Sequence, residues 1–148
     1  MKYKLVVCTI ECTADADPNF KFDWHYVGVI DANMPSQKKS RVMWDAIAAP
    51  YAMMCGSIDD FIHDRFAEEI LKDIEEIETG KAKIWEEGTE AYMFWLTREG
   101  VTFEFQYGEN GPEKGGEVTL AQFKLAVQTY LQFLRDPERK PIEVPFPE

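Results

Sequence analysis

The sequence is poor in the residues and motifs that most often carry catalysis. Its 148 residues include two histidines, His25 and His63, and three cysteines, Cys8, Cys12 and Cys55. It has no CxxC, HExxH or GxSxG motif and neither of the glycine-rich phosphate-binding patterns, GxxxxGKS/T and GxGxxG. We therefore expect no catalytic residues, no bound metal and no cofactor.

The cysteines are best interpreted as reduced thiols, because their number is odd and a chain of this length can fold without disulfides. Cys8 and Cys12 lie on an expected strand, about 13 Å apart at its rise per residue, too far for a disulfide or a shared metal. The apolar run near Lys4 spans about six residues, fewer than the roughly 7–15 of a secretory leader, and no stretch reaches membrane-spanning length. We expect a cytoplasmic protein.

The histidines suggest no site by themselves. His25 occupies a polar position of an alternating aromatic segment, near Asp23, so we expect it on the surface. His25 could act as a general base for a nucleophile only if one of the three cysteines lay beside it. His63 borders the apolar face of an expected helix and is not expected to bind a metal.

Basic residues are scarce. The chain has 16 lysines and arginines against 27 acidic residues, a net charge of −11 and an isoelectric point near 4.7. Phosphates repel such a chain, so the composition argues against nucleic acid and anionic membranes and favours a basic protein as partner. The 45% of hydrophobic and 14% of aromatic residues are typical of a globular domain with a core of large rings.

Hydrophobic periodicity predicts several strands. Residues 3–11 form a β-branched run, residues 20–30 alternate aromatic and polar side chains, and residues 90–97 are apolar at almost every position. A tight turn at residues 98–100 then returns the chain into the half-exposed strand 101–107.

Two helices complete the expected domain. One follows a capping box of Thr119 and Gln122, and the other occupies the acidic segment from residue 58 to 79. We predict an α+β fold with a single antiparallel sheet of four or five strands and these two main helices packed against it. The domain is expected over residues 1–136, and residues 137–148, which contain four prolines, are expected to form an extended tail.

The acidic helix concentrates the negative charge of the chain. Residues 59–78 hold nine carboxylates against Arg65 and Lys72. Ser57 is expected to cap this helix together with Asp60, and Gly80 to end it. Helical spacing predicts a buried stripe of Ile62, Phe66, Ile70, Ile74 and Ile77. It places five carboxylates together on the far side, an acidic ridge formed by Asp60, Asp64, Glu68, Glu75 and Glu78.

The acidic ridge is either a solvated helix face or a surface that binds a partner. Metal binding is not expected, because the segment lacks the alternating oxygen ligands and glycine turn of a calcium loop and the Glu-x-x-His motif of di-metal bundles.

The C-terminal half resembles a known group of proteins. It combines a strand with a tryptophan (EAYMFWLT), a hairpin return (VTFEFQY), a polar loop and a capped V-T-L-x-x-F helix that ends in Y-L-Q-F-L. Over residues 58–136 this is similar to small acidic bacterial immunity proteins, which are encoded beside polymorphic or contact-dependent toxins. The resemblance implies a cytoplasmic, non-catalytic protein that binds one cognate toxin domain and blocks its active site.

An acidic helix suits such a role, because it can mimic phosphates and steer association with a basic cleft. The candidate partner-binding residues are those of the acidic ridge, with Trp85 beside Glu86 and Glu87 as an aromatic anchor. A position in the core is the alternative for Trp85, and the one that its surroundings favour.

Two other functions fit the sequence. One is a ligand-binding or enzymatic domain whose pocket is lined by Trp24, Tyr26, Trp44 and Trp95. The other is a homodimeric or structural adaptor that uses an exposed sheet face. The oligomeric state does not follow from the sequence.

Overall fold

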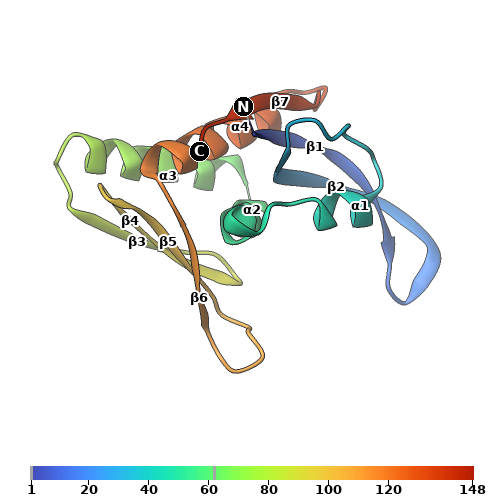
Figure 1. Cartoon of the computed structure of the whole chain (residues 1–148), viewed down its shortest axis with the longest axis horizontal. Coiled ribbons are helices and arrows are strands. Elements are labelled where there is room, and N and C mark those ends of the chain that lie inside the picture. The colour runs from blue at the N-terminus through green and yellow to red at the C-terminus, as the bar shows by residue number, and fades with distance from the viewer. Residues whose placement is uncertain (1, 62) are drawn as a thin grey trace.

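The computed structural model describes residues 2–61 and 63–148 and confirms the α+β class (Figure 1). Its described residues form two antiparallel sheets rather than the one that we expected. The three-stranded sheet has the order β2-β1-β7, and its strands are β1 (Tyr3–Ala14), β2 (Asp17–Asp31) and β7 (Ile142–Phe146). The four-stranded sheet follows chain order with β3 (Ile84–Gly88), β4 (Tyr92–Thr97), β5 (Gly100–Phe105) and β6 (Glu113–Val118).

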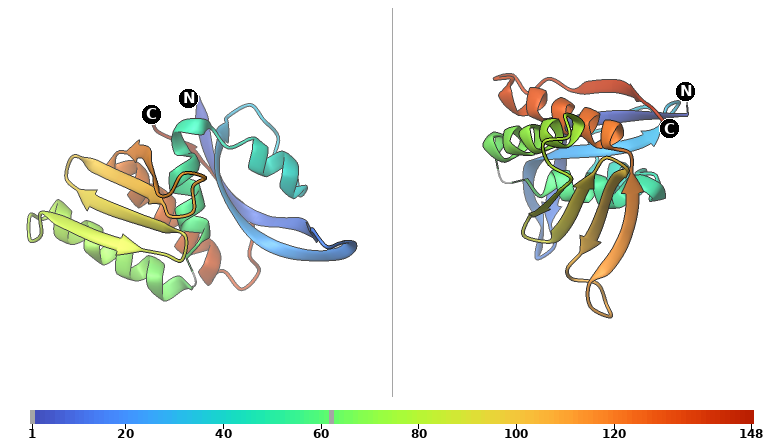
Figure 2. Two further views of the ribbon diagram at one scale, coloured as in Figure 1. Left: turned by 90° about the horizontal axis from the view of Figure 1, so that it is seen from below. Right: turned by 90° about the vertical axis from the view of Figure 1, so that its left-hand side faces the viewer.

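Helical segments separate the two sheets in the sequence. They are α1 (Ser40–Asp45), the 3-10 turn η1 (Ala49–Tyr51), α2 (Ala52–Asp59), α3 (Asp64–Glu78) and α4 (Leu120–Arg135). Helices α3 and α4 lie together on one face of the β3–β6 sheet (Figure 2). None of the helices in the described ranges is both long and apolar enough to cross a bilayer.

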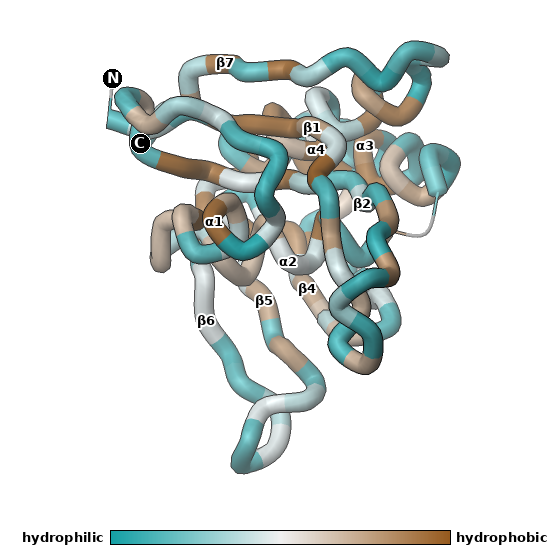
Figure 3. Tube along the Cα trace, turned by 90° about the vertical axis from the view of Figure 1, so that its right-hand side faces the viewer, coloured by the Kyte–Doolittle hydropathy of each residue, from teal (hydrophilic) through white to brown (hydrophobic). Residues whose placement is uncertain are grey.

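The β1–β2 hairpin packs both of its faces near its base. On one face, Leu5, Val7 and Val29 join the main core between the two sheets and the helices. On the other face, Tyr26 joins a second, smaller core beneath α1 and donates a hydrogen bond from its hydroxyl to the carbonyl of Met43 (2.7 Å). Figure 3 shows a strongly hydrophobic stretch along β1 and mainly hydrophilic residues in the loop after β5.

The proline-rich tail is extended, and its residues 142–146 form β7. This strand pairs antiparallel with β1, and the side chain of Phe146 is fully buried against Tyr51, with ring centroids 5.1 Å apart. The Gln122 amide also donates to the carbonyl of Pro147 (2.7 Å). The end of the chain is therefore fixed by backbone pairing, an aromatic contact and a hydrogen bond.

The acidic segment forms two helices, so the expected capping by Ser57 is wrong. Ser57 lies buried inside α2, and its hydroxyl donates to the carbonyl of Met54 (3.0 Å), a bond that serine readily makes within a helix. Helix α3 begins after His63, whose Nδ1 accepts from the N–H of Phe66 (3.2 Å). The apolar run before residue 59 is itself helical, so α2 ends at Asp59 and α3 begins at Asp64.

The buried stripe of α3 is largely confirmed. Ile70, Ile74 and Ile77 are buried in the main core and Phe66 is half-buried, while Ile62 lies outside the described residues. Gly80 follows the helix with a positive φ of 79°, which suits its role as the end signal.

Helix α4 matches its prediction closely. The Thr119 hydroxyl accepts from the N–H of Gln122 (3.0 Å), and the Gln122 side-chain oxygen accepts from the N–H of Thr119 (2.9 Å). Both expected bonds of the capping box are therefore present. On its inward face Phe123, Val127 and Tyr130 are buried, and Leu131 and Leu134 are half-buried.

Candidate functional site

Much of the acidic ridge is paired within the molecule. Arg135 of α4 donates from Nε to Asp64 (3.4 Å) and from Nη2 to Glu68. Lys124 of α4 lies 2.9 Å from Glu78. These pairs link α3 to α4, so three members of the ridge have a structural role that sequence spacing did not reveal.

The two remaining residues of the ridge are separated from each other. Asp60 lies outside α3, in the connection before it, where its carboxylate accepts from the N–H of Ala91 (2.9 Å). Glu75 is exposed on α3. The structure therefore does not bring the five predicted carboxylates together as one open negative face.

A different group of carboxylates converges between α3 and β3. Asp73 of α3 faces Glu87 of β3, with Glu69 and Glu76 nearby on the helix. Burial is the main cause that raises the pKa of Asp73 to about 7, and the hydrogen bond and negative charge of Glu87 raise it further. We call these four residues the α3–β3 acidic group.

Trp85 lies at the border of the α3–β3 acidic group. Its side chain is half-buried against the main core, and its indole N–H donates to Glu76 (3.0 Å). Lys81 also approaches Glu76, at 3.9 Å. Trp85 therefore combines the two roles considered for it: its ring packs on the core while its polar edge contacts an acidic surface.

Sequence reasoning missed the α3–β3 acidic group because half of the contact comes from a strand. On the helix alone, Glu69, Asp73 and Glu76 border the buried stripe on the side away from the acidic ridge. The available signal was the alternation of β3, which places Trp85 and Glu87 on the same face of the sheet.

His25 belongs to a polar cluster that is half-buried against α2 and α4, so its expected position on the surface is wrong. Its side chain is 19% exposed, and Nε2 lies 3.0 Å from the Tyr130 hydroxyl and 3.3 Å from the backbone oxygen of Asp59. The indole of Trp24 stacks on the imidazole, with ring centroids 4.8 Å apart. The alternation of β2 was read correctly, but helices α2 and α4 cover this position, which β2 alone could not indicate.

The protonation of this cluster is set by desolvation. Burial raises the pKa of Asp59 to about 7 and lowers the pKa of His25, so both side chains favour their neutral forms although they lie 3.6 Å apart. Burial also raises the pKa of Tyr130. Within the described ranges, Asp59 Oδ1 is buried without a hydrogen-bond partner.

The cluster does not have the composition expected for nucleophilic catalysis. The recorded side-chain partners of His25 are Asp59, Tyr130 and Trp24, and the cysteine that a paired nucleophile would require is not among them. Burial raises the pKa of Cys8 to about 11 and that of Cys55 to about 12, which disfavours the reactive thiolate. In the described part of the chain, no three acidic, histidine or cysteine side chains converge as a metal site would require.

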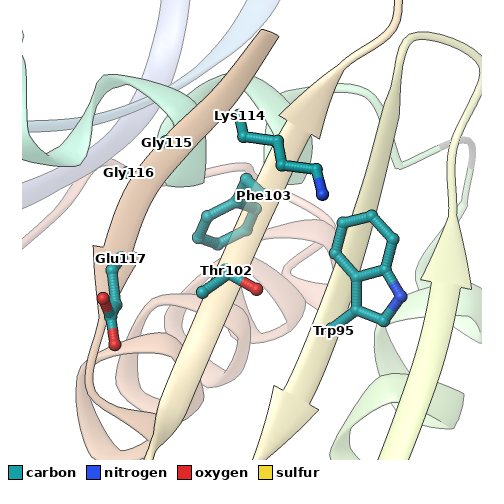
Figure 4. Close-up of a pocket in the computed structure, with 7 residues that line it drawn as sticks. All are labelled: Trp95, Thr102, Phe103, Lys114, Gly115, Gly116 and Glu117. Atoms are coloured by element: carbon teal, nitrogen blue, oxygen red, sulfur yellow. The ribbon is translucent and has the colours of Figure 1, made fainter. Parts of the chain in front are cut away.

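The four aromatic residues proposed to line one pocket lie in three places. Tyr26 and Trp44 pack against each other in the second core, with ring centroids 5.1 Å apart, and Trp24 lies on the hairpin. Trp95 lines a hollow of about 490 Å³ on the face of the β3–β6 sheet that is turned away from α3 and α4 (Figure 4). Lys114 points towards the Trp95 ring, with its ammonium 6.0 Å from the ring centroid.

No protein-family description, curated protein or solved structure matches this chain.

Proposed function

We propose that this chain is a non-catalytic binding protein that neutralises a basic protein partner, in the manner of a bacterial immunity protein acting on a toxin in the cytoplasm. The observation that carries the proposal is the α3–β3 acidic group. In it Asp73 and Glu87 share a hydrogen bond, Glu69 and Glu76 add negative charge nearby on a chain of net charge −11, and Lys81 is the recorded cationic neighbour.

Crowded carboxylates favour a cationic partner for a physical reason. Partial burial, followed by the hydrogen bond and negative charge of Glu87, raises the pKa of Asp73 to about 7, so Asp73 is partly protonated at neutral pH. A lysine or arginine brought by a partner would offset this negative charge, lower the pKa of Asp73 and release the proton. Binding of a basic partner should therefore tighten as the pH rises through about 7.

The acidic ridge is less suited than the α3–β3 acidic group to direct contact with the partner. Asp64 and Glu68 already share Arg135, and Glu78 has Lys124. In this proposal the ridge contributes long-range attraction, with Glu75 as its freely exposed member, and the α3–β3 acidic group with Trp85 forms the contact itself.

The test uses the protein encoded by the gene beside this one, purified in an inactive form, and measures its dissociation constant by calorimetry. In one variant, Glu69→Gln, Asp73→Asn and Glu87→Gln remove three carboxyl groups, which are all ionised at pH 8, from the acidic group, and binding is measured at pH 8. We expect binding to weaken at least about tenfold, as for charges in direct contact.

The matched control removes three charges from the ridge by Asp64→Asn, Glu68→Gln and Glu75→Gln, and we expect a change of less than about threefold, as for peripheral charges. Equal weakening in both variants would mean that only net charge matters. Failure of the wild-type chain to bind the neighbouring protein would contradict the proposed function.

The hollow at Trp95 supports a small-ligand function as a second candidate. Its volume of about 490 Å³ lies within the usual range for small-molecule sites, and Lys114 and Glu117 supply polar groups at its wall. Thermal shift against a panel of metabolites tests it. A stabilising compound whose effect is lost in Trp95→Ala would favour this candidate, and no shift with any compound would count against it.

A further inference from the structure

The outer half of the β1–β2 hairpin carries an exposed aromatic face. Phe20, Phe22 and Trp24 are 58%, 40% and 47% exposed. Phe20 and Phe22 alternate along β2 and lie on one side of the sheet, with ring centroids 6.2 Å apart. The Trp24 indole borders them and stacks on the imidazole of His25, 4.8 Å away. An aromatic side chain has roughly 150–250 Å² of surface, so these rings leave about 300 Å² of apolar surface in water, the size of patches that often bind a partner.

This aromatic face continues one of the two cores. Trp24 pairs across the hairpin with Ile10, and Phe22 with Cys12; Ile10 is buried in the second core and Cys12 packs against it. Helix α1 covers the base of this face, whereas the hairpin extends beyond it (Figures 1 and 2). This face of the hairpin is therefore packed in the second core at its base and exposed to solvent at its outer half.

The opposite face of the hairpin is acidic. Glu11 and Asp23 lie directly opposite each other on the paired strands, an arrangement of like charges that destabilises a hairpin. Lys21 lies 3.7 Å from Glu11, and Asp15 and Asp17 lie at the turn. Each strand of the hairpin therefore has an apolar side and a negatively charged side.

Strand β2 is also an edge of its sheet. In the part of the chain that the structure describes, the backbone bonds of residues 20–24 are those to β1, while the base of the strand is covered where Ala48 donates to the carbonyl of Val29 (2.9 Å). The outer half of β2 can therefore accept another strand by backbone pairing.

We propose that a protein partner adds a strand to the outer edge of β2, and that this strand alternates apolar side chains with lysine or arginine. Its apolar residues would continue the face of Phe20 and Phe22, beside the Trp24 ring. Its cationic residues would fall on the side of Glu11 and Asp23, where they offset the repulsion between these carboxylates.

The charges select this occupant over two others. A second copy of the chain would bring a second acidic hairpin face against the first, and each copy has a net charge of −11. An anionic lipid surface would be repelled by the same carboxylates. The hairpin lies at the other end of the molecule from α3 and β3 (Figure 2), so this surface is additional to the α3–β3 acidic group and does not depend on the proposed function.

The test uses a fluorescent synthetic peptide of alternating leucine and lysine, with an alternating leucine and glutamate peptide as its counterpart. We expect the cationic peptide to bind and the acidic one not to bind. Amide protons of residues 20–24 should become protected from exchange in the complex. Protection confined to α3 and β3, or equal binding of the two peptides, would overturn the proposal.

The variant with Phe20→Thr and Phe22→Thr removes two rings while keeping residues that favour strands. We expect at least about tenfold weaker binding of the cationic peptide, as for the loss of aromatic anchors. The matched control is Tyr107→Thr, which removes a 68% exposed ring elsewhere and should leave the affinity unchanged. Unchanged binding in the double variant would overturn the proposal.

Two further measurements separate the other occupants. A cationic peptide N-methylated at every residue has no free N–H on either of its edges, so we expect it to lose binding to the wild-type chain; retained binding would overturn strand addition. Binding to vesicles of zwitterionic lipid, or a dimer in sedimentation, would also overturn the proposal if either depended on Phe20 and Phe22.

Discussion

Replacement of Asp59 by asparagine should make the protein more stable at neutral pH. The carboxyl group is 20% exposed, its Oδ1 is buried, and burial raises its pKa from 3.8 to about 7. Between these two values the unfolded chain ionises Asp59 while the folded chain keeps it protonated. The protonated Asp59 therefore contributes to the free energy of unfolding fully below pH 3.8, and this contribution is lost progressively as the pH rises to about 7.

The size of this effect follows from the two pKa values. Each unit of difference is worth about 1.4 kcal/mol, so the upper limit at pH 8 is about 4 kcal/mol. Asparagine has the same shape and no charge, so Asp59→Asn avoids this loss. The free energy of unfolding of the variant should exceed that of the wild type by an amount that grows from pH 4 to pH 8.

Urea unfolding at pH 4, 5, 6, 7 and 8 measures this difference. Burial also lowers the pKa of His25, but this side chain is present in both proteins, so the difference between them reports Asp59. Asp45→Asn, at an exposed position of α1, is the control for loss of a negative charge. A difference between Asp59→Asn and wild type that stays constant over this pH range would refute the reasoning.

Three other predictions concern the helices. Thr119→Ala removes the cap of α4 and should lower the free energy of unfolding, measured in urea, by about 1 kcal/mol. An unchanged free energy of unfolding would contradict this prediction. Arg135→Ala should lower the melting temperature slightly at low salt and not at 1 M salt, because exposed ion pairs are weak and screened. Asp73→Asn relieves the repulsion with Glu87 and should raise the melting temperature more at pH 8 than at pH 5; an equal rise at both would contradict the assignment.

Local patterns in the sequence predicted β1, β2, β4, β5 and the two longest helices, but not β3, β6 or β7. The capping box at Thr119 and the isoleucine stripe of α3 depend on residues three or four positions apart, and both are present. The α+β class followed from the same short-range periodicity. These features need no knowledge of which elements become neighbours.

Features that depend on tertiary packing were not predictable in the same way. The alternation in β2 placed its rings on one face but could not show that α1 covers only the base of that face. His25 occupies a polar position in the strand pattern, but its side chain contacts Asp59 of α2 and Tyr130 of α4, which shield it from solvent. The division into two sheets likewise depends on strand pairing, including that of β7 with β1, which periodicity leaves open.

The candidate site changed for the same reason. A helical wheel describes the charges of α3 but not the residues of α4 and β3 that meet them. Arg135 and Lys124 neutralise much of the predicted ridge, and Glu87 creates a separate acidic group around Asp73. The negative charge predicted for this helix is therefore divided between a largely paired ridge and a separate group at β3.

The most direct test of the proposed function is the affinity of the chain for the protein encoded beside it, measured by calorimetry at pH 6 and pH 8 for wild type and Asp73→Asn. Our account predicts that the wild type binds more tightly at pH 8, because a basic partner favours the ionised form of Asp73, and that most of this difference is lost in the variant. The same pH dependence in both proteins, or no binding by the wild type, would contradict it.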